Sequence, residues 1–342
     1  MVRKNYPSIS VVIPVYNEEK NLKRLLPSLQ RQTYPKNKIE YIILDDGSTD
    51  ASFALAKKFG AKIIKVVTHD IELNKGIGMY QAKNELVYWL DADMELCSNN
   101  YFELLVAPFI DNPEIVGSFT KEFALDGCTK STINSLLRFI SYHPLQQDPL
   151  YAFFSPSIKG TVIGEKPNYY LCQFKPGKIP AVGRIMYNRK KLLSTAAGKD
   201  KSFIDLESVE IVARAGFEYF AFVPQAKIRH YHADTLSLLI KKRLRNLERD
   251  YLPNLEHKYF LWFNPDSPKD IAKIIFWVIY ANLFFPELIR GIIRSVWKHD
   301  LALLWHPIVA IATTDAILFG FLSQPKGRKF ALKLLKRLTI IH

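Results

Sequence analysis

Two aspartates, Asp91 and Asp93, follow an apolar run at residues 86–90. Such a run is typical of a buried strand, so both carboxylates are expected at its end. Neighbouring carboxylates repel each other unless a cation or water lies between them, and Mg²⁺ and Mn²⁺ prefer oxygen ligands of this kind. The pair predicts a metal site for a diphosphate, although a solvated turn is the alternative that so short a motif leaves open.

The same pattern, a strand followed by polar residues, occurs twice upstream. Residues 8–15 lead into the segment 16–19, and residues 39–44 lead into the segment 45–50. Parallel βα units have this pattern, and open α/β sheets bind ligands at the carboxyl ends of their strands. We therefore expect three strand ends to converge on one crevice.

Four motifs resemble those of the family 2 glycosyltransferases, which have the A-type nucleotide-sugar-binding fold. They are VVIPVYNEE from Val11, LDDGSTD from Leu44, NKGIGMYQAKNELVYWLDAD from Asn74 and FIDLESVEIVARAGF from Phe203. The resemblance covers residues 8–225 and implies that the first two strand ends hold the base and ribose, while the aspartate pair holds Mg²⁺ or Mn²⁺ on the diphosphate. By this resemblance the donor-binding residues are Pro14, Tyr16, Asn17, Glu18, Asp45, Asp46, Lys75 and Asp91. Asp93 is expected to be the direct metal ligand, and Asp91 to contact ribose or a metal-bound water.

The expected fold class is α/β, a mostly parallel sheet flanked by helices, followed by a C-terminal helical region associated with a membrane. Hydrophobic spacing and capping residues predict helices at 17–33, 50–59, 80–84 and 101–110, and a third strand at 61–67. Residues 120–200 mix aromatic residues with Pro and Gly and are interpreted mainly as loops around a pocket. We divide the chain into a nucleotide-sugar-binding part (1–232), a basic amphipathic helix (233–264) and apolar, basic membrane-associated helices (265–342).

The segment from Phe203 supplies the expected catalytic base. The resemblance implies a carboxylate that removes the proton from the acceptor hydroxyl in an inverting transfer. Aligning Asp205 with the family's aspartate gives a helix of the expected length before Gly216, whereas the other alignment puts Ser208 in that place. We choose Asp205 and keep Glu207 as the second candidate, because Ile204 stands where the family usually has Glu.

Three further basic or imidazole side chains are candidates for the diphosphate end of the donor. His230 matches a family histidine that contacts the metal or the diphosphate, with His232 as its competitor. Arg184 precedes an expected strand and helix, and either approaches the donor or lies in an ordinary surface turn. Arg245, on the predicted basic amphipathic helix at 236–251, is expected to reach the diphosphate, although a solvated helix face is the alternative.

The charge of the chain is concentrated in its C-terminal third. The net charge is +14, and residues 227–342 hold 19 Lys and Arg against 9 Asp and Glu. Such an excess favours an anionic partner, and the apolar segments among these residues favour a membrane surface over nucleic acid. The three cysteines, Cys97, Cys128 and Cys172, are widely spaced and indicate no disulfide framework. With no apolar segment of the secretory type at the start, we expect the cytoplasmic face of the membrane.

Two apolar blocks in the tail, residues 274–286 and 301–314, are too short for confident membrane spans. A span needs about 20 apolar residues, and each block reaches that length only by including an acidic residue, Glu287 or Asp315. If both spanned, the basic residues between them would lie on the outer side, against the positive-inside tendency. Interfacial or re-entrant helices are therefore expected, with a two-helix hairpin as the second possibility.

The sequence thus predicts an inverting glycosyltransferase that moves a sugar from a UDP- or GDP-sugar to a lipid-linked or glycan acceptor. Two other functions are open: a metal-dependent nucleotidyltransferase, and a membrane scaffold that binds nucleotide-sugar without turnover. The PVYNEE and DDGSTD segments disfavour the first, and the irregular segment around Asp205 is the best support for the second.

Overall fold

A computed structural model describes residues 6–120, 136, 139, 156–180, 182–195, 205–253, 255 and 264–339. The chain divides into two compact units. The N-terminal unit consists of residues 1–124 and 156–231, and the C-terminal unit of residues 125–155 and 232–342. The functional boundaries expected at residues 232 and 264 stay predictions.

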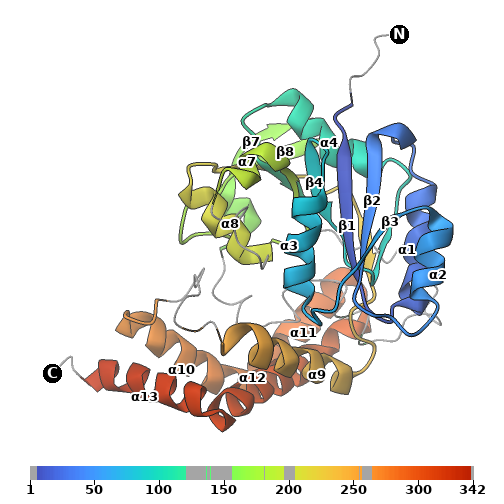
Figure 1. Cartoon of the computed structure of the whole chain (residues 1–342). Coiled ribbons are helices and arrows are strands. Elements are labelled where there is room, and N and C mark those ends of the chain that lie inside the picture. Colours follow the sequence, from blue (N-terminus) through green and yellow to red (C-terminus); the bar gives the residue numbers. More distant parts are fainter. Residues whose placement is uncertain are drawn as a thin grey trace. The chain divides into compact units, whose positions relative to one another are not determined.

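The N-terminal unit is built on a nine-stranded mixed sheet with the order β3-β2-β1-β4-β9-β6-β10-β8-β7 (Figure 1). Its strands are β1 (Ile9–Val15), β2 (Ile39–Asp45), β3 (Lys62–Lys65), β4 (Leu86–Trp89), β6 (Gly117–Phe119), β7 (Val162–Lys166), β8 (Tyr169–Gln173), β9 (Met186–Asn188) and β10 (Tyr219–Phe222). Its helices are α1 (Glu19–Gln30), η1 (Lys36–Lys38), α2 (Ser52–Phe59), α3 (Ile71–Gln81), α4 (Tyr101–Asp111), η3 (Ile158–Thr161), α7 (Arg189–Leu193) and α8 (Asp205–Arg214). A separate two-stranded ribbon pairs β5 (Met94–Leu96) with β11 (Ile228–His230).

The first four strands of the main sheet form the predicted parallel βα arrangement. β1 pairs in parallel with β2 and β4, and β2 pairs in parallel with β3. Beyond β4 the sheet is mixed, because β9 runs antiparallel to β4 and to β6. The predicted fold class, an α/β sheet flanked by helices, is confirmed.

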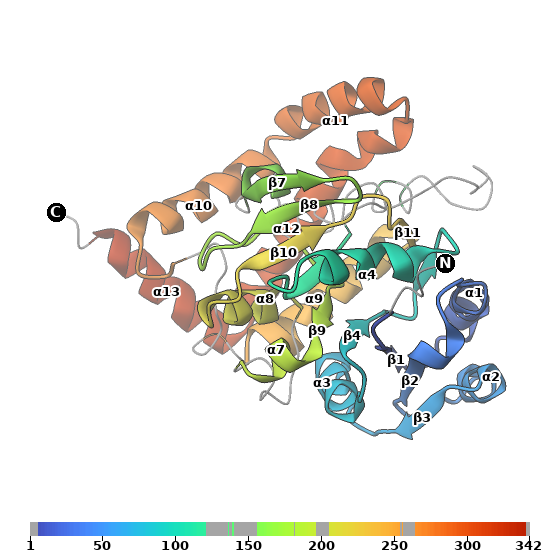
Figure 2. The ribbon, with the colours of Figure 1, turned by 90° about the horizontal axis from the view of Figure 1, so that it is seen from above.

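The helices α1 and α3 cover opposite faces of the parallel strands (Figures 1 and 2). The predicted apolar stripe of α1 is buried in one core with alternate β1 side chains such as Val11 and Ile13. Its members are Leu22, Leu25, Leu26 and Leu29. The predicted start at Asn17 is wrong, because Asn17 has a positive φ of 53° and the helix begins at Glu19.

The predicted helix at residues 80–84 is wrong, because α3 spans Ile71–Gln81 and residues 82–84 are not helical. Helix α3 begins after Asp70, whose side chain caps the amides of Glu72 and Leu73. Glycines at two positions weaken the helical signal in the sequence, but Gly78 is needed for packing. A Cβ there would lie 2.2 Å from Val12 Cγ1, so the missing side chain lets α3 lie directly on β1.

A hairpin that the sequence analysis interpreted as loop widens the sheet. β7 and β8 pair in antiparallel fashion, and β8 pairs with β10. The turn between them falls at Pro167 and Asn168, residue types that favour turns. Most residues of β7 are exposed. Its sequence therefore lacks the alternation of apolar and polar residues that marks a half-buried strand.

The C-terminal unit is helical throughout its described part. Its elements are α9 (Leu236–Asn246), the π-turn η5 (Leu247–Tyr251), α10 (Pro268–Asn282), α11 (Phe285–Lys298), η6 (Leu301–Trp305), α12 (His306–Ser323) and α13 (Pro325–Thr339). Among the described residues, the 23-residue segment Leu301–Ser323 is long and apolar enough to cross a membrane. The α10–α11 pair meets the same criterion as one unit, but it bends by 73°. Buried core helices of soluble proteins have the same length and composition.

We predict that Gly78→Ala lowers the free energy of unfolding by about 1–3 kcal/mol, because the added methyl group overpacks the α3–β1 contact. An exposed helical glycine would show the opposite sign, since Ala is the better helix former by about 1 kcal/mol. Urea unfolding of Gly78→Ala, Val12→Ala and the double variant measures the effect. Val12→Ala removes the clashing methyl groups, so Gly78→Ala should cost much less in that background. A stabilised Gly78→Ala protein would contradict the close packing.

Candidate functional site

The carboxyl ends of β1, β2 and β4 lie at one edge of the sheet. Val15 at the end of β1 is paired with Asp45, and Val12 with Trp89 at the end of β4. Pro14 lies within β1 and is paired with Leu44. Parallel pairing therefore gathers the polar segments that follow these strands, which is where open α/β sheets bind ligands.

The turn after β1 is fixed to the loop after β2 through Asn17. Its side-chain oxygen accepts a hydrogen bond from the Thr49 amide at 2.8 Å, and its own amide donates to the Ser48 hydroxyl at 3.0 Å. The Glu18 amide donates to the Ser52 hydroxyl at 2.8 Å. These contacts explain why Asn17 holds its left-handed backbone, and a donor-binding role for either residue stays a prediction.

Tyr16 and His69 form an aromatic pair beside this turn. Tyr16 is 52% exposed, and its ring centroid lies 5.6 Å from that of His69 in an edge-on arrangement. His69, in the loop after β3, has a positive φ of 49°, a strained conformation that is commonest at functional sites. Sequence reasoning missed His69, and its only signal is its place shortly after the third strand.

The two aspartates at the end of β2 are buried, with 4% and 3% of Asp45 and Asp46 exposed. Asp46 accepts hydrogen bonds from the Thr68 amide at 2.8 Å and the Asn74 side chain at 3.0 Å. Burial raises the pKa of Asp46, but backbone and side-chain hydrogen bonds outweigh it and hold the pKa below its usual value. Asp45 accepts a longer bond of 3.4 Å from the Ser48 amide. Asp46 therefore anchors the loop after β3 as a charged carboxylate.

Lys75 brings a buried positive charge to the aspartate pair that follows β4. Its Nζ lies 3.7 Å from Asp91 Oδ1 and 3.4 Å from Glu72 Oε1. Its backbone oxygen accepts a hydrogen bond of 3.2 Å from the Trp89 indole, which fixes α3 against the end of β4. An ammonium group with only 4% exposure needs such carboxylate partners. Asp91 and Lys75, both predicted donor-binding residues, are thus neighbours.

His230 lies beside Asp93 although the two are far apart in sequence. The β5–β11 ribbon pairs His230 with Met94, and the Tyr231 amide donates to the Asp93 carbonyl oxygen at 2.8 Å. His230 Nε2 is 3.4 Å from Asp93 Oδ1, and the imidazole is buried. The structure therefore brings together the carboxylate and the imidazole predicted as metal ligands.

One carboxylate and two imidazoles form a group able to hold a metal ion. Ligand atoms of Asp93, His230 and His232 lie within 4.8 Å of one another. A mixed nitrogen and oxygen set suits Mn²⁺ better than Mg²⁺, because Mg²⁺ strongly prefers oxygen ligands and its own waters. The side chains present therefore fit Mn²⁺.

The two candidate positions on α8, 205 and 207, lie on different sides of the helix. The helix begins at Asp205 and is closed by Gly216, which has a φ of 89°, matching the expected length. At about 100° per residue, positions 205 and 207 are separated by about 200°. Position 205 shares its face with Ser208, whose buried hydroxyl lies 3.1 Å from that of Tyr187. The placement of the Asp205 side chain lies outside the described residues.

Glu210 is a buried carboxylate on α8 that sequence reasoning missed. It accepts a hydrogen bond of 2.9 Å from the Gly177 amide. It also forms an ion pair of 2.7 Å with Arg214. These contacts tie α8 to the loop before β9. They hold α8 in place without help from its first turn, which carries the predicted base Asp205.

The two predicted donor-binding arginines lie in different units. Arg184, in the loop before β9, has a positive φ of 56°. Burial raises the pKa of Tyr101, and the positive charge of Arg184 opposes that rise. A strained non-glycine residue at this position favours a specific role over an ordinary surface turn. Arg245 lies on the predicted basic helix, α9, in the C-terminal unit.

Part of the chain matches known glycosyltransferases. The glycosyl transferase family 2 model matches residues 10–160. 4,4'-Diaponeurosporenoate glycosyltransferase of Staphylococcus haemolyticus is 36% identical over 110 residues, which cover 30% of this chain and 28% of that protein. Poly(ribitol-phosphate) β-N-acetylglucosaminyltransferase TarS of Staphylococcus aureus is 35% identical over 91 residues, covering 25% of this chain and 16% of that protein. The chain thus matches less than a third of the length of either relative.

Among solved structures, mannosyltransferase PcManGT from Pyrobaculum calidifontis in complex with GDP-Man and Mn²⁺ has a TM-score of 0.47 and 12% identity. That comparison covers 99% of this chain and 77% of the other. The motifs that resemble the family in the sequence, the parallel strands that carry them and the match over residues 10–160 agree. The similarity to glycosyltransferase family 2 thus lies in the N-terminal part of the chain, over residues 10–160.

Proposed function

We propose that the protein is an inverting glycosyltransferase that uses a nucleotide-sugar donor at a membrane surface. The observation that carries the proposal is the pairing of charges at the end of β4. Asp91 lies against Lys75, and Asp93 lies against His230. A carboxylate pair with a neighbouring ammonium group and imidazole suits a metal-bound diphosphate, whose charge the Lys75 ammonium group and the metal offset.

At the nucleotide end, the exposed Tyr16 and His69 rings supply flat surfaces for a base, and the β2 aspartates supply acceptors for ribose hydroxyls. The base and ribose would therefore lie over the ends of β1 and β2, and the diphosphate toward β4. Both UDP- and GDP-sugars suit this arrangement. Asp93 and His230, with His232, would hold Mn²⁺, which when bound offsets the negative charge on the departing diphosphate.

At the acceptor end, Asp205 is the proposed base. The acceptor oxygen attacks the anomeric carbon while its proton passes to the carboxylate. The bond between that carbon and the diphosphate oxygen breaks, and the nucleoside diphosphate leaves with the electron pair. Glu207 is the second candidate, because it lies within the same first turn of α8.

The proposed membrane surface rests on an inversion of polarity in α11. Glu287 and Ser295 are buried, with 1% and 6% exposed, whereas Ile293, Val296 and Trp297 are 63%, 69% and 76% exposed. Helices in water bury the opposite set. A helix with its apolar side chains outward is stabilised by contact with lipid hydrocarbon, as in an interfacial or re-entrant segment.

The inward polar groups of α11 form a connected set, as a segment in lipid requires. Glu287 lies 3.2 Å from His306 Nδ1 and 3.1 Å from Arg290, and Arg294 lies 3.2 Å from His306 Nε2. The basic excess of this part of the chain favours an anionic leaflet, and we place the protein on the cytoplasmic face. A lipid-linked or glycan acceptor at that surface is the proposed partner, and a diphosphate-binding role for Arg245 of α9 stays a prediction.

We predict that Asp93→Asn abolishes Mn²⁺-dependent binding of nucleotide-sugar, because the amide is a weaker metal ligand and lacks the charge. Thermal unfolding with UDP- and GDP-sugars, with and without Mn²⁺, measures this, since a ligand at 100 times its Kd stabilises by about 2.7 kcal/mol. Asp111→Asn, at the exposed end of α4, is the control and should behave like wild type. Unchanged Mn²⁺-dependent affinity in Asp93→Asn would remove this residue from the metal site.

We predict that Asp205→Asn lowers kcat by about 10²- to 10⁴-fold, the usual contribution of a positioned base, with the KM for the donor almost unchanged. Glu207→Gln should have a much smaller effect. Sugar transfer from labelled donor to a membrane extract measures both. The reverse order of effects would identify Glu207 as the base. Donor binding without any product in wild type would favour the scaffold, and release of pyrophosphate would favour nucleotidyl transfer.

We predict that the double variant Ile293→Glu, Trp297→Glu no longer sediments with anionic vesicles, while the wild type stays bound in high salt because apolar burial is not screened. The control is Ile110→Glu, which alters an isoleucine of α4 that is 52% exposed, and it should bind like wild type. A wild-type protein that is soluble without detergent and forms a defined oligomer would show instead that this face of α11 joins two copies.

A further inference from the structure

The ribbon that carries His230 is too small to fix its own position. β5 and β11 are three residues each, and neither is hydrogen-bonded into the main sheet. An isolated two-stranded ribbon is marginally stable at best. Side-chain contacts must therefore determine where β11, and with it His230, lies relative to Asp93.

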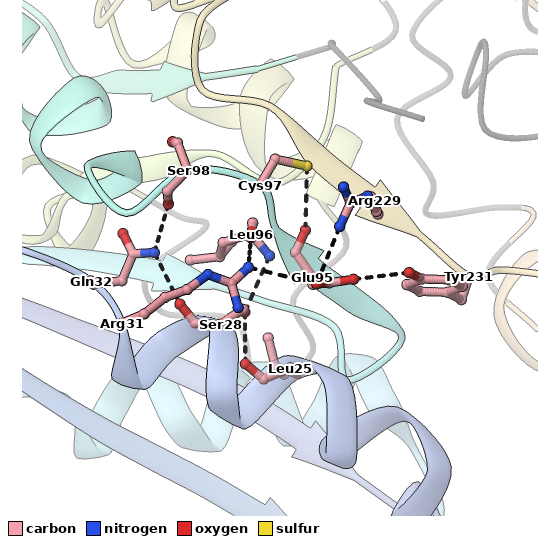
Figure 3. Close-up of polar contacts among 10 residues, drawn as sticks. All are labelled: Leu25, Ser28, Arg31, Gln32, Glu95, Leu96, Cys97, Ser98, Arg229 and Tyr231. Carbon is pink, nitrogen blue, oxygen red and sulfur yellow. Dashed lines mark hydrogen bonds and ion pairs between the residues drawn. The ribbon is translucent and has the colours of Figure 1, made fainter. Parts of the chain in front are cut away.

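Met94, Leu96 and Ile228 anchor the ribbon in the hydrophobic core, and Glu95 makes its polar contacts from the middle of β5 (Figure 3). Directly across the ribbon, Arg229 lies 3.3 Å from Glu95 Oε1, and the Tyr231 hydroxyl donates to Oε2 at 2.9 Å. Arg229 and Tyr231 are the residues on either side of His230. One carboxylate thus holds both neighbours of the imidazole.

Helix α1 fixes the β5 side of the ribbon, as Figure 3 shows. The Leu96 amide donates to the Ser28 hydroxyl at 3.2 Å, and Arg31 lies 3.6 Å from Glu95 Oε1. The guanidinium group of Arg24 stacks on the Tyr231 ring, 4.3 Å from its centroid. Because α1 packs on the main sheet, these contacts give Glu95 a rigid base.

We infer that Glu95 is a positioning residue for His230, and through it for the metal that Asp93 and His230 are proposed to hold. The inference rests on the proposed function. Glu95 is 17% exposed as a side chain, and its role is to keep the imidazole within reach of Asp93 before any donor arrives. Without it, the two arginines lose a shared carboxylate, and the β11 segment keeps only the Arg24–Tyr231 contact among the links to α1 described above.

The test measures the binding of Mn²⁺ alone to the full chain. The readout is the electron paramagnetic resonance signal of free Mn²⁺, which falls as the ion binds. Glu95→Ala should weaken Mn²⁺ binding about 10- to 100-fold, the range for outer-shell partners of metal ligands. Glu103→Ala is the matched control, because Glu103 accepts a hydrogen bond of 2.6 Å from Thr33 nearby but is not part of the ribbon. Its Mn²⁺ affinity should equal that of wild type.

A double-mutant cycle separates positioning from general destabilisation. If Glu95 acts through His230, the loss in Glu95→Ala, His230→Ala should be no larger than in His230→Ala alone. Tyr231→Phe removes one of the two contacts and should give a smaller loss, which keeps the test valid if Glu95→Ala does not fold. Wild-type affinity in folded Glu95→Ala, or losses that simply add, would overturn the inference. A wild type that binds no Mn²⁺ would instead refute the metal site in the proposed function.

Discussion

The N-terminal unit depends on compensating the negative charge gathered at one edge of its sheet. Parallel pairing of β1, β2 and β4 brings the segments with Asp45, Asp46, Asp91 and Asp93 to that edge. Each of the last three has a distinct partner within the unit, respectively the amides around Thr68, the ammonium of Lys75 and the imidazole of His230. Each partner comes from a different segment, so contacts with these carboxylates hold the loops and helices around the edge in place.

The different partners of these carboxylates indicate how one edge of the sheet could bind both the nucleoside and the diphosphate of a donor. Asp46 is hydrogen-bonded inside the protein and shapes the loop that carries His69. Asp91 and Asp93 have cationic or imidazole partners with which a diphosphate and a metal would interact directly. A carboxylate bound within the protein at the nucleoside end, and carboxylates with an ammonium or imidazole partner at the other end, match the chemistry proposed, since it is the diphosphate end of the donor that gains negative charge during transfer.

Much of this arrangement could be predicted because it depends on local signals. Strands that end in polar residues identified β1, β2 and β4, and leucine spacing identified α1. Gly78 and the β7–β8 hairpin could not be predicted this way, because a glycine that weakens a helix in isolation is required by β1, and an exposed hairpin lacks a buried face. Glu95 and Glu210 were missed for a related reason: their partners lie far away in sequence, and nothing local marks them.

The β5–β11 ribbon has a consequence for how the protein is made. Arg229 and Glu95 are separated by 134 residues, so the contacts that place His230 are among the most non-local in the N-terminal unit. Such contacts form late, because closing a long loop costs chain entropy before the contact rewards it. During synthesis, β1 to β4 can assemble while the ribosome is still adding the second half of the unit. Asp93 and His230, the proposed metal ligands, can therefore come together only after residue 230 has emerged from the ribosome.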